Sequence, residues 1–88
     1  MTSFVNDIVP LFRQKDINCM RDMGVDLTSY TYMSDATGDA SYADHANARH
    51  VLARLRGDEM PRMPMGGPYW NDGALGAYRN WVEEGFKA

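Results

Sequence analysis

The sequence contains one cysteine, Cys19, among its 88 residues. A single thiol cannot form an intramolecular disulfide framework, nor a zinc or iron–sulfur site that needs several cysteines. No apolar run approaches the ~20 residues that a membrane-spanning helix needs. Residues 1–7 also lack the basic and apolar regions of a secretory signal. We therefore expect a cytoplasmic protein with no membrane partner.

The charge of the chain is small and dispersed. Nine Lys and Arg residues and twelve Asp and Glu residues give a formal net charge of −3. The basic residues are scattered along the sequence, whereas a nucleic-acid-binding protein concentrates them on one face. We therefore expect no nucleic-acid partner.

No catalytic motif is present in the sequence. The acidic residues are dispersed, and there is no Ser/His/Asp order, glycine-rich phosphate loop or paired-carboxylate spacing. His45 and His50 are five residues apart, which is not the i, i+4 spacing that places two imidazoles on one helix face. Structural roles at or near the surface are favoured for both histidines, and we expect no enzymatic activity.

The first half of the chain predicts three short helices. Ser3 is a suitable N-cap for a helix over residues 4–12, in which Pro10 removes a backbone donor and so predicts a kink or a late start. Residues 16–23 predict a second helix. A third helix, of one or two turns, is expected to begin with Thr28 as its cap.

The second half predicts two longer helices separated by a loop. Residues 42–56 form the clearest helical pattern, and Gly57 follows as a stop. Residues 60–69 contain three prolines and two glycines, which exclude a regular helix. Asp72 is the expected cap of the last helix. Because no segment alternates with period two, we expect one all-α domain over residues 1–88, with four to five short helices and the Met/Pro/Gly loop before the C-terminal helix.

Five fragments, taken in order, resemble small c-type cytochrome domains. They are Phe4-x-x-Asp7-Ile8-x-Pro10-Leu11-Phe12, Gly24-Val25-Asp26-Leu27-Thr28-Ser29-Tyr30, Asn47-Ala48-x-x-x-Leu52-x-x-Leu55, Met60-Pro61 to Met63-Pro64, and Trp81-Val82-x-x-Gly85. The resemblance covers nearly the whole chain. It implies a cytochrome c-like fold in which the first and last helices cross and the Met-Pro loop faces a central cavity.

The stretch that corresponds to the haem-attachment motif of this family has changed. In the family, Cys-x-x-Cys-His supplies two thioether bonds and the proximal iron ligand. Here Cys19 is kept, Asp22 stands where the second Cys belongs, and Met23 stands where the His belongs. The chain is thus similar to haem-free relatives of cytochrome c. This likeness implies a domain without a cofactor that is not itself an electron carrier.

Methionines are concentrated around the expected cavity. Met60, Met63 and Met65 form a Met-x-x-Met-x-Met cluster, and the resemblance places Met20 and Met23 across the cavity from it. Packing is the favoured interpretation, because Met is a flexible filler of cores. We expect no empty pocket of haem size and at least one of these methionines to be largely buried between the first and last helices. The alternative is Cu(I) bound by the cluster and by Met20 or Met23, since thioethers are soft ligands.

Tyr69 and Trp70 form a candidate protein-contact patch, with packing in the core as the equal alternative. For Cys19, a buried apolar thiol is favoured over a reactive one. A domain with neither a redox centre nor a catalytic motif is expected to act as an accessory or interaction module for another protein or enzyme. The sequence leaves the identity of that partner and the oligomeric state open.

Overall fold

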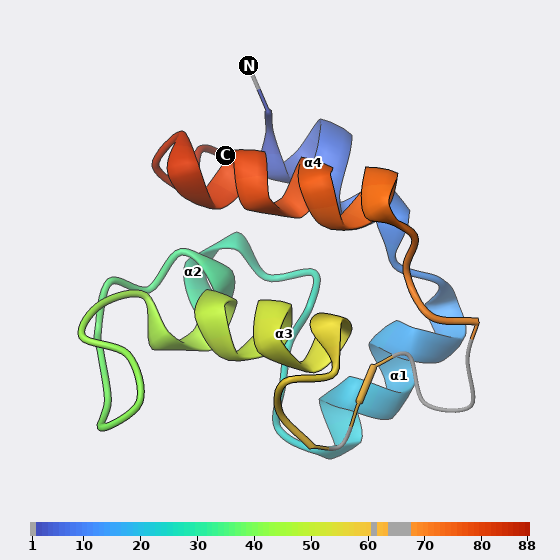
Figure 1. The fold of residues 1–88 in the computed structure, drawn as a ribbon, viewed down its shortest axis with the longest axis horizontal. Coiled ribbons are helices and arrows are strands. Elements are labelled where there is room, and N and C mark those ends of the chain that lie inside the picture. The colour runs from blue at the N-terminus through green and yellow to red at the C-terminus, as the bar shows by residue number, and fades with distance from the viewer. Residues whose placement is uncertain (1, 61, 64–67) are drawn as a thin grey trace.

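The computed structural model describes residues 2–60, 62–63 and 68–88. Across these ranges the regular structure is helical and contains no strand, which confirms the all-α prediction. The elements, shown in Figure 1, are η1 (Phe4–Ile8), η2 (Val9–Leu11), α1 (Gln14–Asp22), α2 (Tyr30–Met33), α3 (Ala46–Arg56) and α4 (Asp72–Glu83). None of the helices in the described ranges has the length and apolarity to cross a membrane.

The N-terminal helical segment begins where the sequence predicts. The Ser3 hydroxyl accepts a hydrogen bond from the Asn6 N–H at 3.3 Å and caps the wide π turn of η1. The chain then tightens to the 3-10 turn of η2, which contains Pro10. A proline cannot donate a backbone hydrogen bond, so an α-helix does not continue through it. Of the two alternatives, a kink or a late start, the late start is not observed. The helical segment begins at Phe4, and its geometry changes at Val9, next to Pro10.

Two helices begin one residue away from the expected cap. Ser29, not Thr28, caps α2, because its hydroxyl accepts from the Tyr32 N–H at 3.2 Å. The side chain of Thr28 instead bonds the Asp26 carboxylate. In α4 the cap is Asn71, whose side-chain oxygen accepts from the Ala74 N–H at 2.8 Å. Asp72, the predicted cap, is the first residue of that helix.

Helix α3 is shorter than the sequence predicts. It begins at Ala46 because His45 adopts a left-handed backbone conformation with φ of 49°. Residues 42–45 therefore belong to the preceding loop. The helix ends at Gly57, which has φ of 85° and supplies the left-handed conformation that the predicted stop requires. Val51 and Leu55 bury the inner face of α3.

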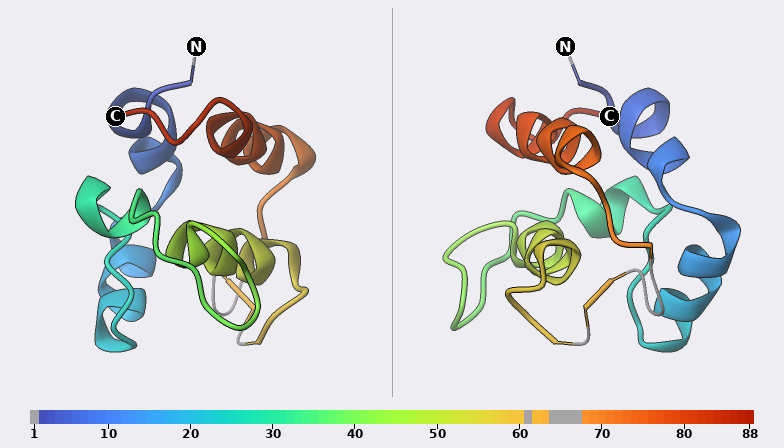
Figure 2. Two further views of the ribbon diagram at one scale, coloured as in Figure 1. Left: turned by 90° about the vertical axis from the view of Figure 1, so that its left-hand side faces the viewer. Right: turned by 45° about the vertical axis from the view of Figure 1, so that its right-hand side comes forward.

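The first and last helical segments lie side by side, as both views in Figure 2 show. The rings of Phe4 and Trp81 are 5.3 Å apart, and the Phe4 N–H donates to the Lys87 carbonyl at 2.9 Å. Helix α4 also packs on α3, where the buried Tyr78 hydroxyl donates to the Ala48 carbonyl at 2.7 Å. The core between these elements consists of Phe4, Ile8, Phe12, Ile17, Met20, Leu27, Met33, Ala48, Val51, Leu55, Met63, Tyr78, Trp81 and Phe86.

Candidate functional site

The predicted methionines fall into two groups in the structure. Met20 and Met63 belong to the core and are only 2% and 1% exposed. Met60 is 73% exposed and Met23 is 43% exposed. Met65 lies outside the described residues. Burial of at least one of these methionines is thus observed, at Met20 on α1 and at Met63 in the loop before α4. The Cu(I) set includes both core and surface side chains.

The hollows found among the described residues are small. Four of them have volumes of about 130–260 Å³, whereas pockets that bury a drug-sized ligand span roughly 300–1,000 Å³. No methionine lines any of these four hollows.

The three residues of the altered attachment motif lie at the C-terminal end of α1. Cys19 is a free thiol that is half-buried, whereas the sequence favours a fully buried one. Asp22 is exposed, and Met23 caps the helix. In the part of the chain that the structure describes, no three His, Cys, Asp or Glu residues lie together as a metal site.

The structure gives Tyr69 and Trp70 different surroundings. Tyr69 is 50% exposed, and the Arg62 guanidinium lies 4.0 Å from the centre of its ring. Trp70 is half-buried and packs its ring against Phe12 at 5.1 Å and Tyr78 at 6.3 Å. Of the two, Tyr69 is the one that presents its ring to a possible partner.

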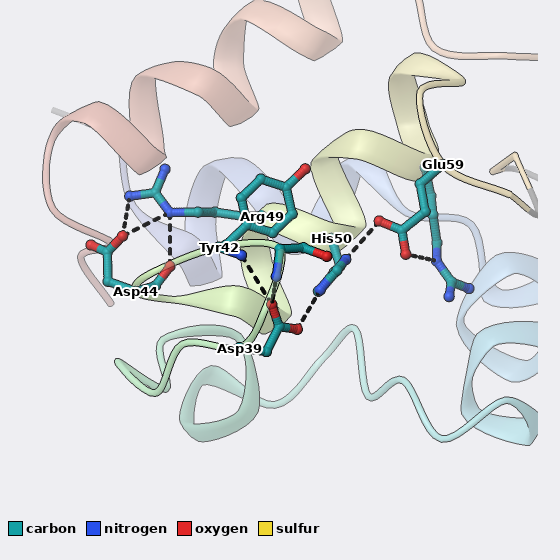
Figure 3. A network of polar contacts seen from close by, with 8 residues as sticks. Asp39, Tyr42, Asp44, Arg49, His50 and Glu59 are labelled. Atoms are coloured by element: carbon teal, nitrogen blue, oxygen red, sulfur yellow. Dashed lines mark hydrogen bonds and ion pairs between the residues drawn. The ribbon is translucent and has the colours of Figure 1, made fainter.

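A polar network that no sequence pattern indicates surrounds His50, as Figure 3 shows. The imidazole Nε2 is 2.5 Å from the Asp39 carboxylate, and Nδ1 is 2.6 Å from the Glu59 carboxylate. An ionised carboxylate only accepts hydrogen bonds. Both ring nitrogens must therefore donate, which makes His50 an imidazolium. We call this arrangement, Asp39–His50–Glu59, the His50 clamp.

Hydrogen bonds to Glu59 and then to Asp39 raise the pKa of His50, and burial opposes them. The imidazole belongs to α3, Asp39 lies in the loop before this helix, and Glu59 lies in the turn after it. The clamp thus connects three segments of the chain. Because both ring nitrogens are occupied, His50 in this arrangement is neither a general base nor a metal ligand.

Asp39 is positioned by its own loop. One carboxylate oxygen accepts from the N–H groups of Ser41 at 2.8 Å and Tyr42 at 3.0 Å, which leaves the other oxygen for His50. The Tyr42 backbone bond is the main cause that lowers the pKa of Asp39, followed by the bond to His50. The edge of the Tyr42 ring also meets the imidazole, with centroids 4.9 Å apart.

Glu59 faces a second cation across a small pocket. The Nε of Arg54 is 3.7 Å from Glu59, while its Nη1 is buried and has no hydrogen-bond partner among the described residues. The pocket beside them has a volume of about 200 Å³ and is lined by Val25, Tyr32, Asn47, His50, Val51, Arg54 and Glu59. Its charged lining residues are Glu59, Arg54 and the imidazolium of His50.

A neighbouring set of contacts joins the end of the loop to the C-terminal tail. Arg49 pairs with the Asp44 carboxylate at 3.0 Å, as Figure 3 shows, and bonds the Asp44 carbonyl at 2.8 Å. The His45 ring stacks on Phe86 with centroids 3.9 Å apart. His45 and Phe86 are also the non-glycine residues with positive φ in the described ranges. Both histidines are half-buried, in line with the structural roles expected for them.

Comparison of the chain with protein-family models, with curated proteins and with solved structures found no match. Any function assigned to the chain therefore depends on its own residues and their geometry.

Proposed function

We propose that the chain is a haem-free domain of cytochrome c-like fold that acts as an accessory or protein-interaction module. The observation that carries this proposal is the burial of Met20 on α1 and Met63 in the loop before α4. The resemblance puts the cofactor cavity between these two segments. Side chains from both of them belong instead to one continuous core.

The pairing of the chain ends supports the same fold. The resemblance implies contact between the first and last helices, and η1 packs on α4 through Phe4 and Trp81. The Met-rich loop is also tied to α3, because the Met63 N–H donates to the Arg54 carbonyl at 3.0 Å. These contacts are compatible with a cytochrome c-like arrangement that stands without its cofactor.

Absorption spectroscopy tests the haem-free part of the proposal. We expect the purified chain to show no Soret band, because a thioether cannot form at Asp22 and Met23 replaces the proximal histidine. A Soret band that persists after denaturation would mean covalently attached haem and would contradict the proposal.

The interaction part of the proposal centres on Tyr69. An exposed Tyr beneath an Arg guanidinium combines two residue types that carry much of the binding energy at protein interfaces. Affinity capture from the native host with the tagged chain should retain a specific protein. Tyr69→Ala should lower that retention about tenfold or more.

Val5→Ala is the matched control, because Val5 is also exposed, at 60%, but lies on η1. It should leave capture unchanged. Equal loss in both variants would remove Tyr69 from the contact. Failure to capture a protein, together with a catalytic turnover by the isolated chain, would reject the module.

A further inference from the structure

The loop of residues 35–45, between α2 and α3, is a preformed unit. Its ends are joined by hydrogen bonds from the His45 N–H to the Ala36 carbonyl at 3.2 Å and from the Ala46 N–H to the Thr37 carbonyl at 3.0 Å. The two sides approach so closely that a Cβ at Gly38 would lie 2.2 Å from the Ala43 carbonyl oxygen. The loop therefore keeps its internal shape when its contacts to the rest of the protein change.

Both side-chain contacts from the tip of this loop end on His50. The Asp39 carboxylate accepts a hydrogen bond from its Nε2, and Tyr42 places a ring edge against the imidazole. The base of the loop is held separately, by the Asp44–Arg49 pair and by the stacking of His45 on Phe86. A change at His50 thus acts on the tip and leaves the base attached.

We propose that His50 is a proton-operated latch: its imidazolium holds the tip of the 35–45 loop on α3, and loss of its proton releases that tip. A neutral imidazole has one N–H and one lone pair. Only one of the two carboxylates then keeps its donor, and the other faces a lone pair. Two acceptors that face each other repel, so one side of the His50 clamp must open.

The surroundings decide which side opens. Asp39 and Tyr42 face His50 from the loop, Glu59 faces it from the turn after α3, and Arg54 of α3 and Tyr32 of α2 line the adjoining pocket. Glu59 also lies beside Arg54, whose Nε is 3.7 Å away, so this carboxylate stays in place when the imidazole becomes neutral. Among the described residues, the Asp39 oxygen that faces His50 contacts no cation other than His50. The bond to Glu59 is also the larger of the two causes that raise the pKa of His50. The remaining proton therefore stays on Nδ1, and Asp39 is released.

The direction of the switch follows from the two carboxylates. They raise the pKa of His50 above its ordinary value of 6.5. The loop tip is therefore held below the raised pKa of His50 and is released as the pH rises through it. No other part of the fold has to unfold, because Val51 and Leu55 on the inner face of α3 stay in the core.

Carbon-detected NMR on the full chain tests this latch, because carbon-bound protons do not exchange with water at alkaline pH. We expect the Ala40 and Ala43 signals to shift with the same midpoint as the His50 imidazole, at a pH above about 6.5. The Cα–Hα order parameters of these two loop alanines should fall from about 0.85 to below about 0.6. Ala48, which is buried in α3, should not change.

Two variants separate the latch from general effects of pH. His50→Gln removes the titrating group, so the pH-dependent change in the Ala40 and Ala43 signals, called the step below, should vanish. His45→Asn changes the other histidine but keeps a residue that tolerates the left-handed conformation. The Asp44–Arg49 pair still holds the base of the loop in this variant, so the step should remain. Loss of the step in His45→Asn, or its persistence in His50→Gln, would overturn the proposal.

Asp39→Asn provides a test that does not depend on the fold of the His50 variant. An Asn oxygen can still accept from the Ser41 and Tyr42 amides, while its NH₂ group faces Nε2 of His50. This group donates to a neutral imidazole and clashes with an imidazolium. The loop tip should therefore be held at high pH and released at low pH. An unchanged direction of the step would contradict the latch.

Discussion

Replacing Met63 by alanine should destabilise the protein strongly, because this side chain is only 1% exposed. The change removes three heavy atoms beyond Cβ, and each buried methylene-sized group contributes about 0.8 kcal/mol, which gives about 2.4 kcal/mol. The cavity left behind brings the loss to about 2–4 kcal/mol. A domain of 88 residues has a total stability of only about 4–13 kcal/mol. The variant should therefore lose a large part of its stability.

Urea unfolding followed by circular dichroism measures this loss, and the melting temperature should fall by at least roughly 8 °C. Met60→Ala is the matched control, since Met60 is 73% exposed, and it should change the unfolding free energy by less than about 0.5 kcal/mol. Met63→Leu nearly conserves volume and should cost less than about 1.5 kcal/mol. Equal losses in Met60→Ala and Met63→Ala would refute the assignment of Met63 to the core.

Three further predictions concern other parts of the molecule. Competition with a Cu(I) chelator under reducing conditions should show no binding tighter than about 1 μM, and Met63→Leu should leave this result unchanged; tighter binding that Met63→Leu abolishes would establish the copper alternative. The contribution of His50 to the unfolding free energy should be complete below its unfolded pKa of about 6.5 and should disappear as the pH rises through its higher folded pKa. If His50→Gln showed the same dependence of the unfolding free energy on pH as the unchanged protein, this prediction would be contradicted. Tyr78→Phe removes the buried bond to the Ala48 carbonyl and should lower the unfolding free energy by about 0.5–1.5 kcal/mol; an unchanged denaturation midpoint would exclude a stabilising bond.

Apolar periodicity predicts the helices and their buried faces because residues that pack in the core must recur at the helical spacing. The spacing of Tyr78 and Trp81 indicates one inward face, and both residues are fully buried. Ile17 and Met20 behave in the same way on α1. These assignments depend on residues within one or two turns of each other, which is the range over which a sequence pattern is informative.

Helix boundaries were harder to predict because adjacent residues have similar capping chemistry. Asn71 and Asp72 both carry an oxygen that can accept from a backbone N–H. The structure assigns the cap to Asn71 because it has extended backbone angles, whereas Asp72 is already helical. The early part of the predicted 42–56 helix is lost for a related reason. Because His45 adopts a left-handed conformation, α3 begins at Ala46. The hydrogen bonds that close the preceding loop come from the N–H groups of His45 and Ala46.

The His50 clamp could not be found from sequence spacing. Asp39 and Glu59 lie eleven and nine residues from His50. Both are outside α3 (Ala46–Arg56), so helical periodicity does not place them beside His50. The carboxylates meet the imidazole only because a loop before α3 and a turn after it both fold back on that helix. The contact is thus a property of the folded chain.

Helix α3 combines two independent tasks on different sides. Its inner residues Val51 and Leu55 are 2% and 0% exposed and belong to the core, while His50 is half-buried and binds two loops. Apolar burial does not depend on the protonation of an imidazole, whereas the clamp does. The same helix can therefore stay packed in the core while the loop at its surface changes attachment. This separation makes a local response to pH compatible with a domain whose total stability is small.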